Sequence, residues 1–545
     1  MSSIGVSGGT TVYIRQIGSD IQFSTNELIW TTFTFPCTVL NTDISGGNVI
    51  VSFSTDITLT SVNDYFICGS TNLQFGSSSL KNDGTRPIIT IDGVTDYMGL
   101  VENGTSSSNG YNDIKIINLE VLSTNGSTLQ SVNPNFAGWI GQSYYAKGAN
   151  SNFITNCSTD GDIPIYCGGI VGGVSGSDSG YLSISGCNST GSIGSVGGGI
   201  VAISAGANSG NVIVQSCWSS GTIDTGGGGI MGNGAQNATI SSCYSTGLIG
   251  QQSGGICGQA PGRSGGGIVY ISNCYSTGNI GQQGGGIVGN FSGTVNVSNC
   301  YSFGDIANSQ GGGICGVTNV GGQTISNCYA CGTQSGGTGY ITGSQSVVNG
   351  TYTLGTVSTL TNNYSEAANA SSGWNDTNAK SVLTGDPSTT SYGTSWIQPN
   401  GTNTPFLVTN SGYSPYSLQL LKIVSQTVNK GSSTPAGVIS GYTYSILSIN
   451  GLSPSSYSTI SIDSSTGEIS TTSSTEVRLY TIMVYSTKNP YSITQYGLTV
   501  SDPNPPGPTP KPKKRKPVIY FNNTRGTTTI IRCKKCKPIT FGWCL

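Results

Sequence analysis

The chain has 545 residues, with 83 glycines, 16 cysteines and no histidine, and charged residues make up 8% of it, against about 25% in ordinary soluble domains. The absence of histidine excludes nucleophilic systems built on a Ser-His or Cys-His pair and metal sites with histidine ligands. Gly, Ser, Thr and Asn replace the missing charges, and these residues form helices poorly. The composition therefore predicts an all-β protein.

The first part of the chain shows short apolar segments. Residues 48–53, 87–91 and 114–119 are separated by Gly, Asn and Ser turns, which is typical of short strands. They resemble the first turns of a right-handed parallel β-helix of the pectate-lyase type. We expect residues 1–45 to cap this fold, because the open end of a solenoid is an exposed sheet edge, and residues 46–345 to form the β-helix.

A repeat runs through the middle of the chain. In seven units an Ile or Val stands three residues before a Cys, and the cysteines are 30, 30, 26, 31, 26 and 28 residues apart. A Gly-Gly-Ile block follows in the first six units, with its Ile 13 residues after the Cys in five and 14 in the sixth. One unit cannot bury its apolar face alone, so the repeat predicts turns stacked about 4.8 Å apart. The repeat cysteines are Cys157, Cys187, Cys217, Cys243, Cys274, Cys300 and Cys328.

The amino-acid sequence of the repeat resembles that of a known family. The run Asn-Cys-Tyr-Ser-Thr-Gly, followed by Gly-Gly-Ile-Val-Gly, resembles the GLUG repeat of bacterial and viral surface proteins. The match covers residues 153–331, and residues 346–413 resemble the Trp-containing segment that closes such arrays. GLUG repeats build β-solenoids in adhesins and in accessory regions of some surface peptidases, so the resemblance implies surface display and no single activity.

Downstream of the repeat the pattern changes. Residues 414–501 keep the alternation of strands, and Asp463-Ser-Ser-Thr-Gly467 resembles the hairpin of Ig-like and cadherin-like modules. This predicts an Ig-like β-sandwich. Residues 502–517 are a Pro- and Lys-rich linker, and residues 518–545 are predicted to form a small Cys-containing module.

Charge is unevenly distributed between residues 1–502, the body, and residues 503–545, the tail. Residues 503–545 carry ten Lys or Arg and no acidic residue, whereas the remaining 502 residues carry 11 basic and 23 acidic side chains. We expect the tail to dock on an acidic capsid or particle component rather than on nucleic acid, although its basic run also resembles a nuclear-localisation signal. The predicted anchor residues are Lys511, Lys513, Lys514, Arg515 and Lys516.

The cysteines allow several interpretations. We interpret the repeat cysteines as a ladder of buried thiols, in preference to a metal or redox array, because free Cys packs as a small hydrophobe. Cys533, Cys536 and Cys544 have the spacing of half a zinc ribbon or of a redox pair, and simple thiols, a disulfide and a metal site remain alternatives there. No cofactor is expected.

Two further features bear on ligands and catalysis. An aromatic residue follows the repeat Cys at Trp218, Tyr244, Tyr275, Tyr301 and Tyr329. These rings predict a packing ladder or, as the second interpretation, a surface stripe that stacks on glycans. Asp160 and Asp162 could share a face, as glycoside hydrolysis requires of two carboxylates, but turn chemistry explains them better. We therefore do not expect an enzyme.

Together these features predict a structural surface or fibre protein with an adhesive or glycan-displaying role. The chain begins without a Sec-type leader and has no apolar stretch that would span a membrane. A virion-surface fibril or spike, as on a giant-virus capsid, fits both observations, because such a protein would be made in the host cytoplasm. The alternative is an extracellular or cell-surface location. The uncharged faces of the rod predict association into a dimer, trimer or filament. Host-surface glycans are candidate ligands. The competing class is a polysaccharide lyase or glycosidase on a β-helix.

Overall fold

The structure is a computed structural model. It describes residues 2–76 and, with short gaps after residue 263, most of residues 86–365, together with separate strands and turns between residues 396 and 501. The predicted anchor residues and Cys533, Cys536 and Cys544 lie outside the described residues. Within the described residues no helix is long and apolar enough to cross a membrane.

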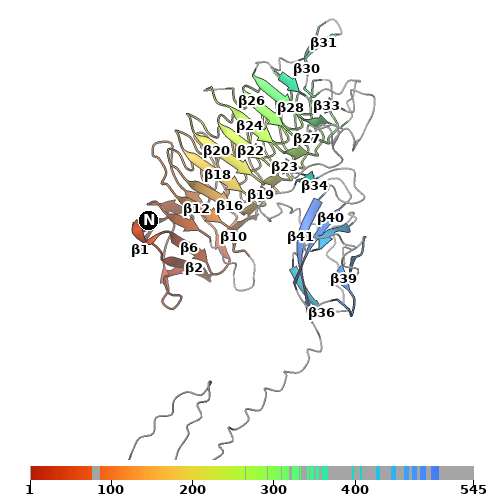
Figure 1. The fold of residues 1–545 in the computed structure, drawn as a ribbon. Helices are drawn as coiled ribbons and strands as arrows, with labels where there is room; N and C mark the ends of the chain where they lie inside the picture. The colour runs from red at the N-terminus through yellow and green to blue at the C-terminus, as the bar shows by residue number, and fades with distance from the viewer. Residues whose placement is uncertain are drawn as a thin grey trace, which may run out of the picture.

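The described chain up to Ser365 forms a parallel β-helix, whose turns stack along one axis (Figure 1). Each turn, or rung, contributes a strand to a long sheet, a shorter strand to a narrow sheet and a segment to a third wall. This confirms the predicted all-β solenoid. The helical content of the described residues is a single 3-10 turn, Ile44–Gly46.

The long sheet has fourteen strands, of which all but the two at the N-terminal edge pair in parallel with the next rung. From the last rung to the first, its strands are β32 (Thr359–Thr361), β28 (Gln323–Ser326), β26 (Val295–Ser298), β24 (Val269–Ser272), β22 (Ala238–Ser241), β20 (Asn211–Gln215), β18 (Tyr181–Ser185), β16 (Asn152–Thr155), β12 (Ile114–Ile117), β9 (Leu73–Phe75), β6 (Val49–Phe53), β2 (Thr11–Ile17), β3 (Asp20–Ser24) and β4 (Thr31–Thr32).

The narrow sheet has eleven parallel strands, most of them two residues long. They are β33 (Tyr364–Ser365), β29 (Tyr329–Ala330), β27 (Tyr301–Ser302), β25 (Tyr275–Ser276), β23 (Tyr244–Ser245), β21 (Trp218–Ser219), β19 (Asn188–Ser189), β17 (Ser158–Thr159), β13 (Glu120–Thr124), β10 (Ile88–Asp92) and β7 (Ile57–Leu59).

The third wall begins as a four-stranded sheet and continues as single parallel bridges. Its strands are β1 (Ser2–Ser7), β5 (Cys37–Asp43), β8 (Phe66–Cys68) and β11 (Val101–Glu102). From Val101 the wall passes through Gly141 and Val171, and one residue of each later rung extends it to Thr342. Residues 1–45 thus supply strands to two walls, and β3 and β4 add antiparallel strands at the edge of the long sheet.

The spacing of the sequence repeat is the register of the long sheet. The Ile or Val that precedes each repeat Cys pairs with its equivalent in the next rung, from Ile154 with Ile184 through to Ile325 with Leu360. These side chains point inward and are buried, whereas their neighbours in the strand are half-buried or exposed. A slip of one residue would move the apolar side chains to the outer face, so the burial pattern fixes the register.

One residue turns the chain between the two sheets. The residue before each repeat Cys has a positive φ, for example 56° at Asn156, 54° at Ser216 and 51° at Asn273. Among residues with a side chain, Asn tolerates this left-handed conformation best because its amide can form local hydrogen bonds. The Asn that recurs in the repeat is therefore a turn residue.

Among the described residues, four hairpins and one four-stranded sheet lie outside these walls or close to their end. The hairpins are β14 (Ser131–Val132) with β15 (Asn135–Phe136), β30 (Ser344–Val348) with β31 (Thr351–Leu354), β34 (Trp396–Ile397) with β35 (Phe406–Leu407), and β38 (Ile460–Ile462) with β39 (Ile469–Thr471). A further sheet runs in the order β36 (Ser425–Asn429), β41 (Ser492–Ser501), β40 (Leu479–Ser486) and β37 (Tyr444–Ile449). Most of the loops of the predicted Ig-like sandwich lie outside the described residues.

Glycines of the third wall are required by the close approach of successive rungs. A Cβ atom at Gly199 would overlap the carbonyl oxygen of Gly229 in the next rung and would crowd Ser219. At Gly5, a Cβ atom would make only ordinary contacts with Thr42 and Leu40.

We predict that Gly199→Ala lowers the free energy of unfolding by about 1–3 kcal/mol, the usual cost of overpacking, and lowers the melting temperature recorded by circular dichroism. Gly5→Ala, the matched control, should melt close to the unmodified protein. Equal melting temperatures for the two variants would contradict the stacking of the third wall.

Candidate functional site

The seven repeat cysteines form a hydrogen-bonded ladder. All are fully buried, and none of the twelve cysteines in the described residues forms a disulfide. From Cys157 to Cys274 the backbone N–H of each donates to the Sγ atom of the next, at an N–S distance of 3.4 Å. Each thiol in turn donates to the carbonyl oxygen two residues earlier, at 3.2–3.4 Å. The thiols thus satisfy N–H groups that the turn leaves without a backbone partner.

Burial disfavours the ionised form of these thiols. Burial raises the pKa of Cys157 and Cys187 well above its usual range. In the third wall burial raises the pKa of Cys257 from an ordinary value of 9.0 to about 12. Because the thiolate is the form that attacks disulfides and binds metals, the described thiols suit packing. No group of three or more potential metal ligands occurs among the described residues.

The pKa of Cys257 predicts a loss of stability at alkaline pH. The unfolded thiol releases its proton near pH 9 and the folded thiol near pH 12, so between these values the unfolded state binds fewer protons and the free energy of unfolding falls as pH rises. Cys257 contributes a slope of about 1.4 kcal/mol per pH unit.

Urea unfolding between pH 8 and pH 11 should therefore show a shallower pH dependence for Cys257→Ala. The control is Val288→Ala, which opens a similar cavity at the position that bridges to Cys257 in the next rung but removes no titrating group. Equal pH slopes for Cys257→Ala and the unmodified protein would contradict the prediction.

The aromatic column is a buried stack. The ring centroids of Tyr244, Tyr275 and Tyr301 are 4.9 Å apart with nearly parallel planes, and Trp218 lies 5.9 Å from Tyr244. Ser276 points into the solenoid, since it contacts the position of a Cβ at Gly255 in the third wall, and alternation along the strand turns Tyr275 outward.

The five aromatic side chains are at most 5% exposed. A glycan stripe needs free ring faces, whereas Trp218, Tyr244, Tyr275 and Tyr301 stack on one another and Tyr329 is fully buried. The packing interpretation therefore describes these rings, and the glycan-stripe interpretation of Trp218, Tyr244, Tyr275, Tyr301 and Tyr329 is corrected.

Asp160 and Asp162 hold neighbouring rungs together. Asp160 accepts a hydrogen bond from the backbone N–H of Ser123, at 2.8 Å, in the preceding rung. Asp162 accepts one from Ser192, at 2.9 Å, in the following rung. Desolvation raises the pKa of Asp160, with a smaller contribution from the charge of Asp162. These carboxylates thus bond to neighbouring rungs, 37 and 30 residues away in the chain.

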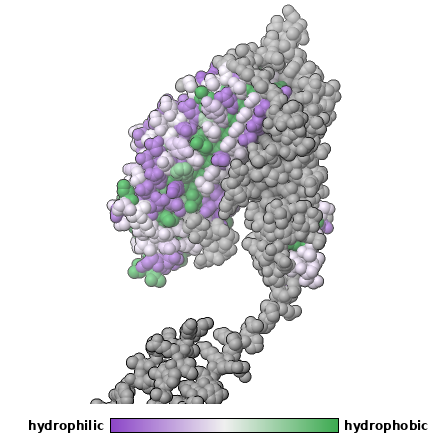
Figure 2. All heavy atoms as spheres, viewed as in Figure 1, coloured by the Kyte–Doolittle hydropathy of each residue, from purple (hydrophilic) through white to green (hydrophobic). Residues whose placement is uncertain are grey.

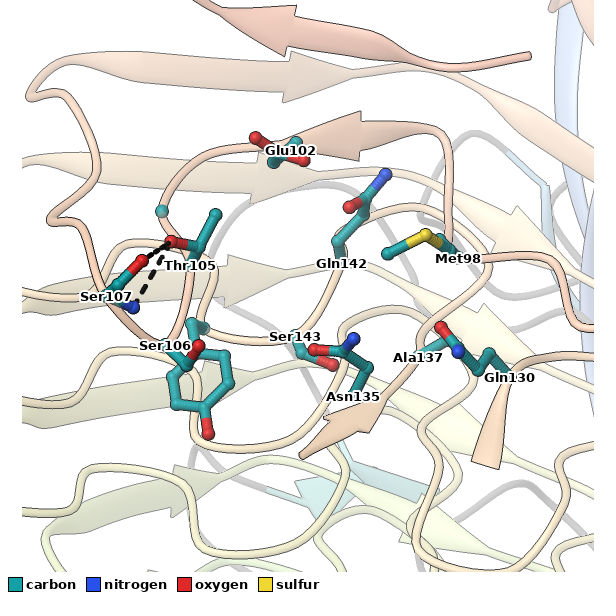
Figure 3. Close-up of a pocket in the computed structure, with 12 residues that line it drawn as sticks. Met98, Glu102, Thr105, Ser106, Ser107, Gln130, Asn135, Ala137, Gln142 and Ser143 are labelled. Atoms are coloured by element: carbon teal, nitrogen blue, oxygen red, sulfur yellow. Dashed lines mark hydrogen bonds between the residues drawn. The ribbon is translucent and has the colours of Figure 1, made fainter. Parts of the chain in front are cut away.

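A pocket that the sequence did not reveal lies where the irregular first rungs meet the repeat (Figure 3). It has a volume of about 280 Å³. Its lining comes from the end of β11 with the loop that follows it, from the β14–β15 hairpin region, and from the rung segment 142–144. The lining residues are Met98, Glu102, Gly104, Thr105, Ser106, Ser107, Gln130, Asn135, Ala137, Gln142, Ser143 and Tyr144.

Two polar atoms of this lining are buried without a hydrogen-bond partner. They are the hydroxyl oxygen of Ser143, a residue that is 8% exposed, and the side-chain carbonyl oxygen of Gln130. A buried polar atom without a partner costs about 1–3 kcal/mol. Native proteins tolerate few of them, and each calls for an explanation.

Several other groups of the pocket wall are held by hydrogen bonds. The Gln142 amide donates to the carbonyl oxygen of Gly99 at 3.0 Å. The Thr105 hydroxyl accepts from the backbone N–H of Ser108 at 3.1 Å, and Lys147 donates to the carbonyl oxygen of Ser106 at 2.8 Å. Burial raises the pKa of Glu102, the one acidic residue of the lining.

Sequence reasoning could not have found this pocket. Glu102, Gln130 and Ser143 have no common motif, and an inserted hairpin separates two of them in the chain. The available signal was the irregularity of the region between residues 99 and 150, where the spacing of the later repeat has not yet begun.

The fold and its internal ladders define this chain as a parallel β-solenoid protein. No model of a known protein family matches the chain, and no curated protein matches it. Among solved structures, a putative immunoglobulin A1 protease from Bacteroides ovatus is similar, with 16% sequence identity over 64% of this chain and 91% of that chain, and a TM-score of 0.24. The assignment of the fold rests on the register of the described strands.

Proposed function

We propose that this protein is a structural surface protein, a virion fibril or spike in which the β-helix is the shaft and the basic C-terminal tail is the anchor. The observation that carries the proposal is the unbroken parallel register from β2 to β32. At about 4.8 Å per step, its twelve parallel strands span about 50 Å. A rod of hydrogen-bonded rungs is suited to holding an attachment site away from a surface.

The rest of the proposal draws on the sequence. The GLUG-like motif supports surface display, on a giant-virus capsid or, as the alternative, at a cell surface. The ten basic residues of the tail, beside a body with a net charge of −12, support docking on an acidic particle component. Charged residues make up only 8% of the chain, and on the face drawn in Figure 2 hydrophobic residues lie among hydrophilic ones. Both features are compatible with lateral association into an oligomer.

Deletion of residues 503–545 should leave the circular dichroism spectrum of the solenoid unchanged and abolish attachment to particles, measured by co-sedimentation. Attachment of the full chain should weaken as salt rises, because the Debye length falls from about 10 Å at 0.1 M to about 3 Å at 1 M. A truncated chain that still co-sediments would contradict the anchor. Accumulation of the full chain in nuclei, lost on neutralisation of Lys513, Lys514, Arg515 and Lys516, would instead support nuclear targeting.

The competing function, polysaccharide cleavage, can be tested directly. Incubation with neutral and acidic polysaccharides should release no reducing ends and no unsaturated products, since Asp160 and Asp162 are engaged with backbone N–H groups. Turnover that is lost in Asp160→Asn or Asp162→Asn, but kept in Asp178→Asn, would replace the structural proposal with an enzyme.

A further inference from the structure

We propose that the pocket between Glu102, Gln130 and Ser143 binds one ring of a neutral sugar. This inference deepens the adhesive part of the proposed function and rests on it for its biological setting. Its physical argument stands on the pocket alone, which belongs to the described β-helix and not to the tail.

The unpartnered atoms define the chemistry of the ligand. The Gln130 carbonyl oxygen can only accept a hydrogen bond, whereas the Ser143 hydroxyl can donate and accept. The Glu102 carboxylate, when ionised, adds further acceptor sites. A ligand with several hydroxyl groups matches this set, because hydroxyls can donate to the two acceptors and accept from Ser143.

The charge of the pocket excludes acidic ligands. Glu102 is the one charged side chain of the lining, so an acidic sugar would bring a second negative charge beside it. The Lys147 ammonium group at the rim is already paired with the Asp178 carboxylate, 3.4 Å away. Burial also raises the pKa of Glu102, which reflects a site that disfavours charge. A neutral polyol meets both conditions.

Size and shape restrict the ligand further. Pockets for drug-sized ligands measure about 300–1,000 Å³, so a volume of about 280 Å³ fits a single sugar ring. The half-buried Tyr144 also lines the pocket, and an aromatic side chain there combines an apolar ring with a polar tip. Such a ring can pack against the C–H face of a pyranose while the hydroxyls reach the polar wall.

The rim is ordered before a ligand arrives. Lys147 connects the 104–108 loop to the next rung, because its ammonium group donates to Ser106 and lies 3.4 Å from the Asp178 carboxylate. A preformed rim reduces the entropy that binding must overcome.

The test is saturation-transfer NMR and titration calorimetry on the full chain with free glucose, galactose, mannose and N-acetylglucosamine, beside sialic acid and Ca²⁺. At least one neutral sugar should bind with a dissociation constant on the order of 1 mM, as a single small ring permits. Ser143→Ala should weaken that binding about fivefold to tenfold, as expected for one lost hydrogen bond. Glu102→Gln, which keeps an acceptor oxygen, should bind within about threefold of the unmodified protein.

Ser245→Ala is the matched control. Its hydroxyl is also buried without a partner, but it lies in the narrow sheet away from the pocket. The two serine variants therefore make the same change to the folded protein, and only Ser143→Ala should affect binding. Absence of binding by every neutral sugar, equal binding by Ser143→Ala, or binding of sialic acid or Ca²⁺ alone would overturn the proposal. None of these outcomes depends on particle attachment, so the structural proposal is tested separately.

Discussion

Parallel stacking in register is the constraint on which the rest of this structure depends. Each side chain of the repeat lies about 4.8 Å from its equivalent in the next rung, so a position accepts only residues that pack well on copies of themselves. Ile on Ile, Tyr on Tyr and the Cys ladder satisfy this condition. Like charges would repel at that distance, which gives a physical reason for the low charge of the chain.

The same constraint explains what the sequence could predict. Because the repeat spacing is the structural register, the alignment of Ile154 with Ile184 and of Cys157 with Cys187 could be predicted from counting alone. Side chains that serve the turns were harder to interpret. The residue before each repeat Cys, an Asn in four of the seven units, adopts a positive φ, and Asp162 accepts a hydrogen bond from the next rung. Neither role is visible without knowing which residues become neighbours.

The pocket was beyond prediction for a related reason. Its residues come from rungs that do not follow the repeat, and inserted segments bring Gln130 and Ser143 together. The sequence could not distinguish a buried stack of aromatic rings from an exposed stripe, because both have the same sequence spacing. The burial of the rings in the structure distinguishes them. Periodicity thus predicts the neighbours of a residue within the solenoid, but not its exposure to solvent.

The two ends of the cysteine ladder show how the series stops. In the rung before Cys157, Leu119 occupies the position of the repeat Cys. After Cys328, the last Cys of the ladder, the Asn363 amide accepts a hydrogen bond from the N–H of Cys328 and donates one to the carbonyl oxygen of Ile325. Between these ends, each rung pairs with the next through the same strand positions and the same Cys. Duplication or loss of one 26- to 31-residue unit in the gene would therefore lengthen or shorten the rod by one step without creating a new interface.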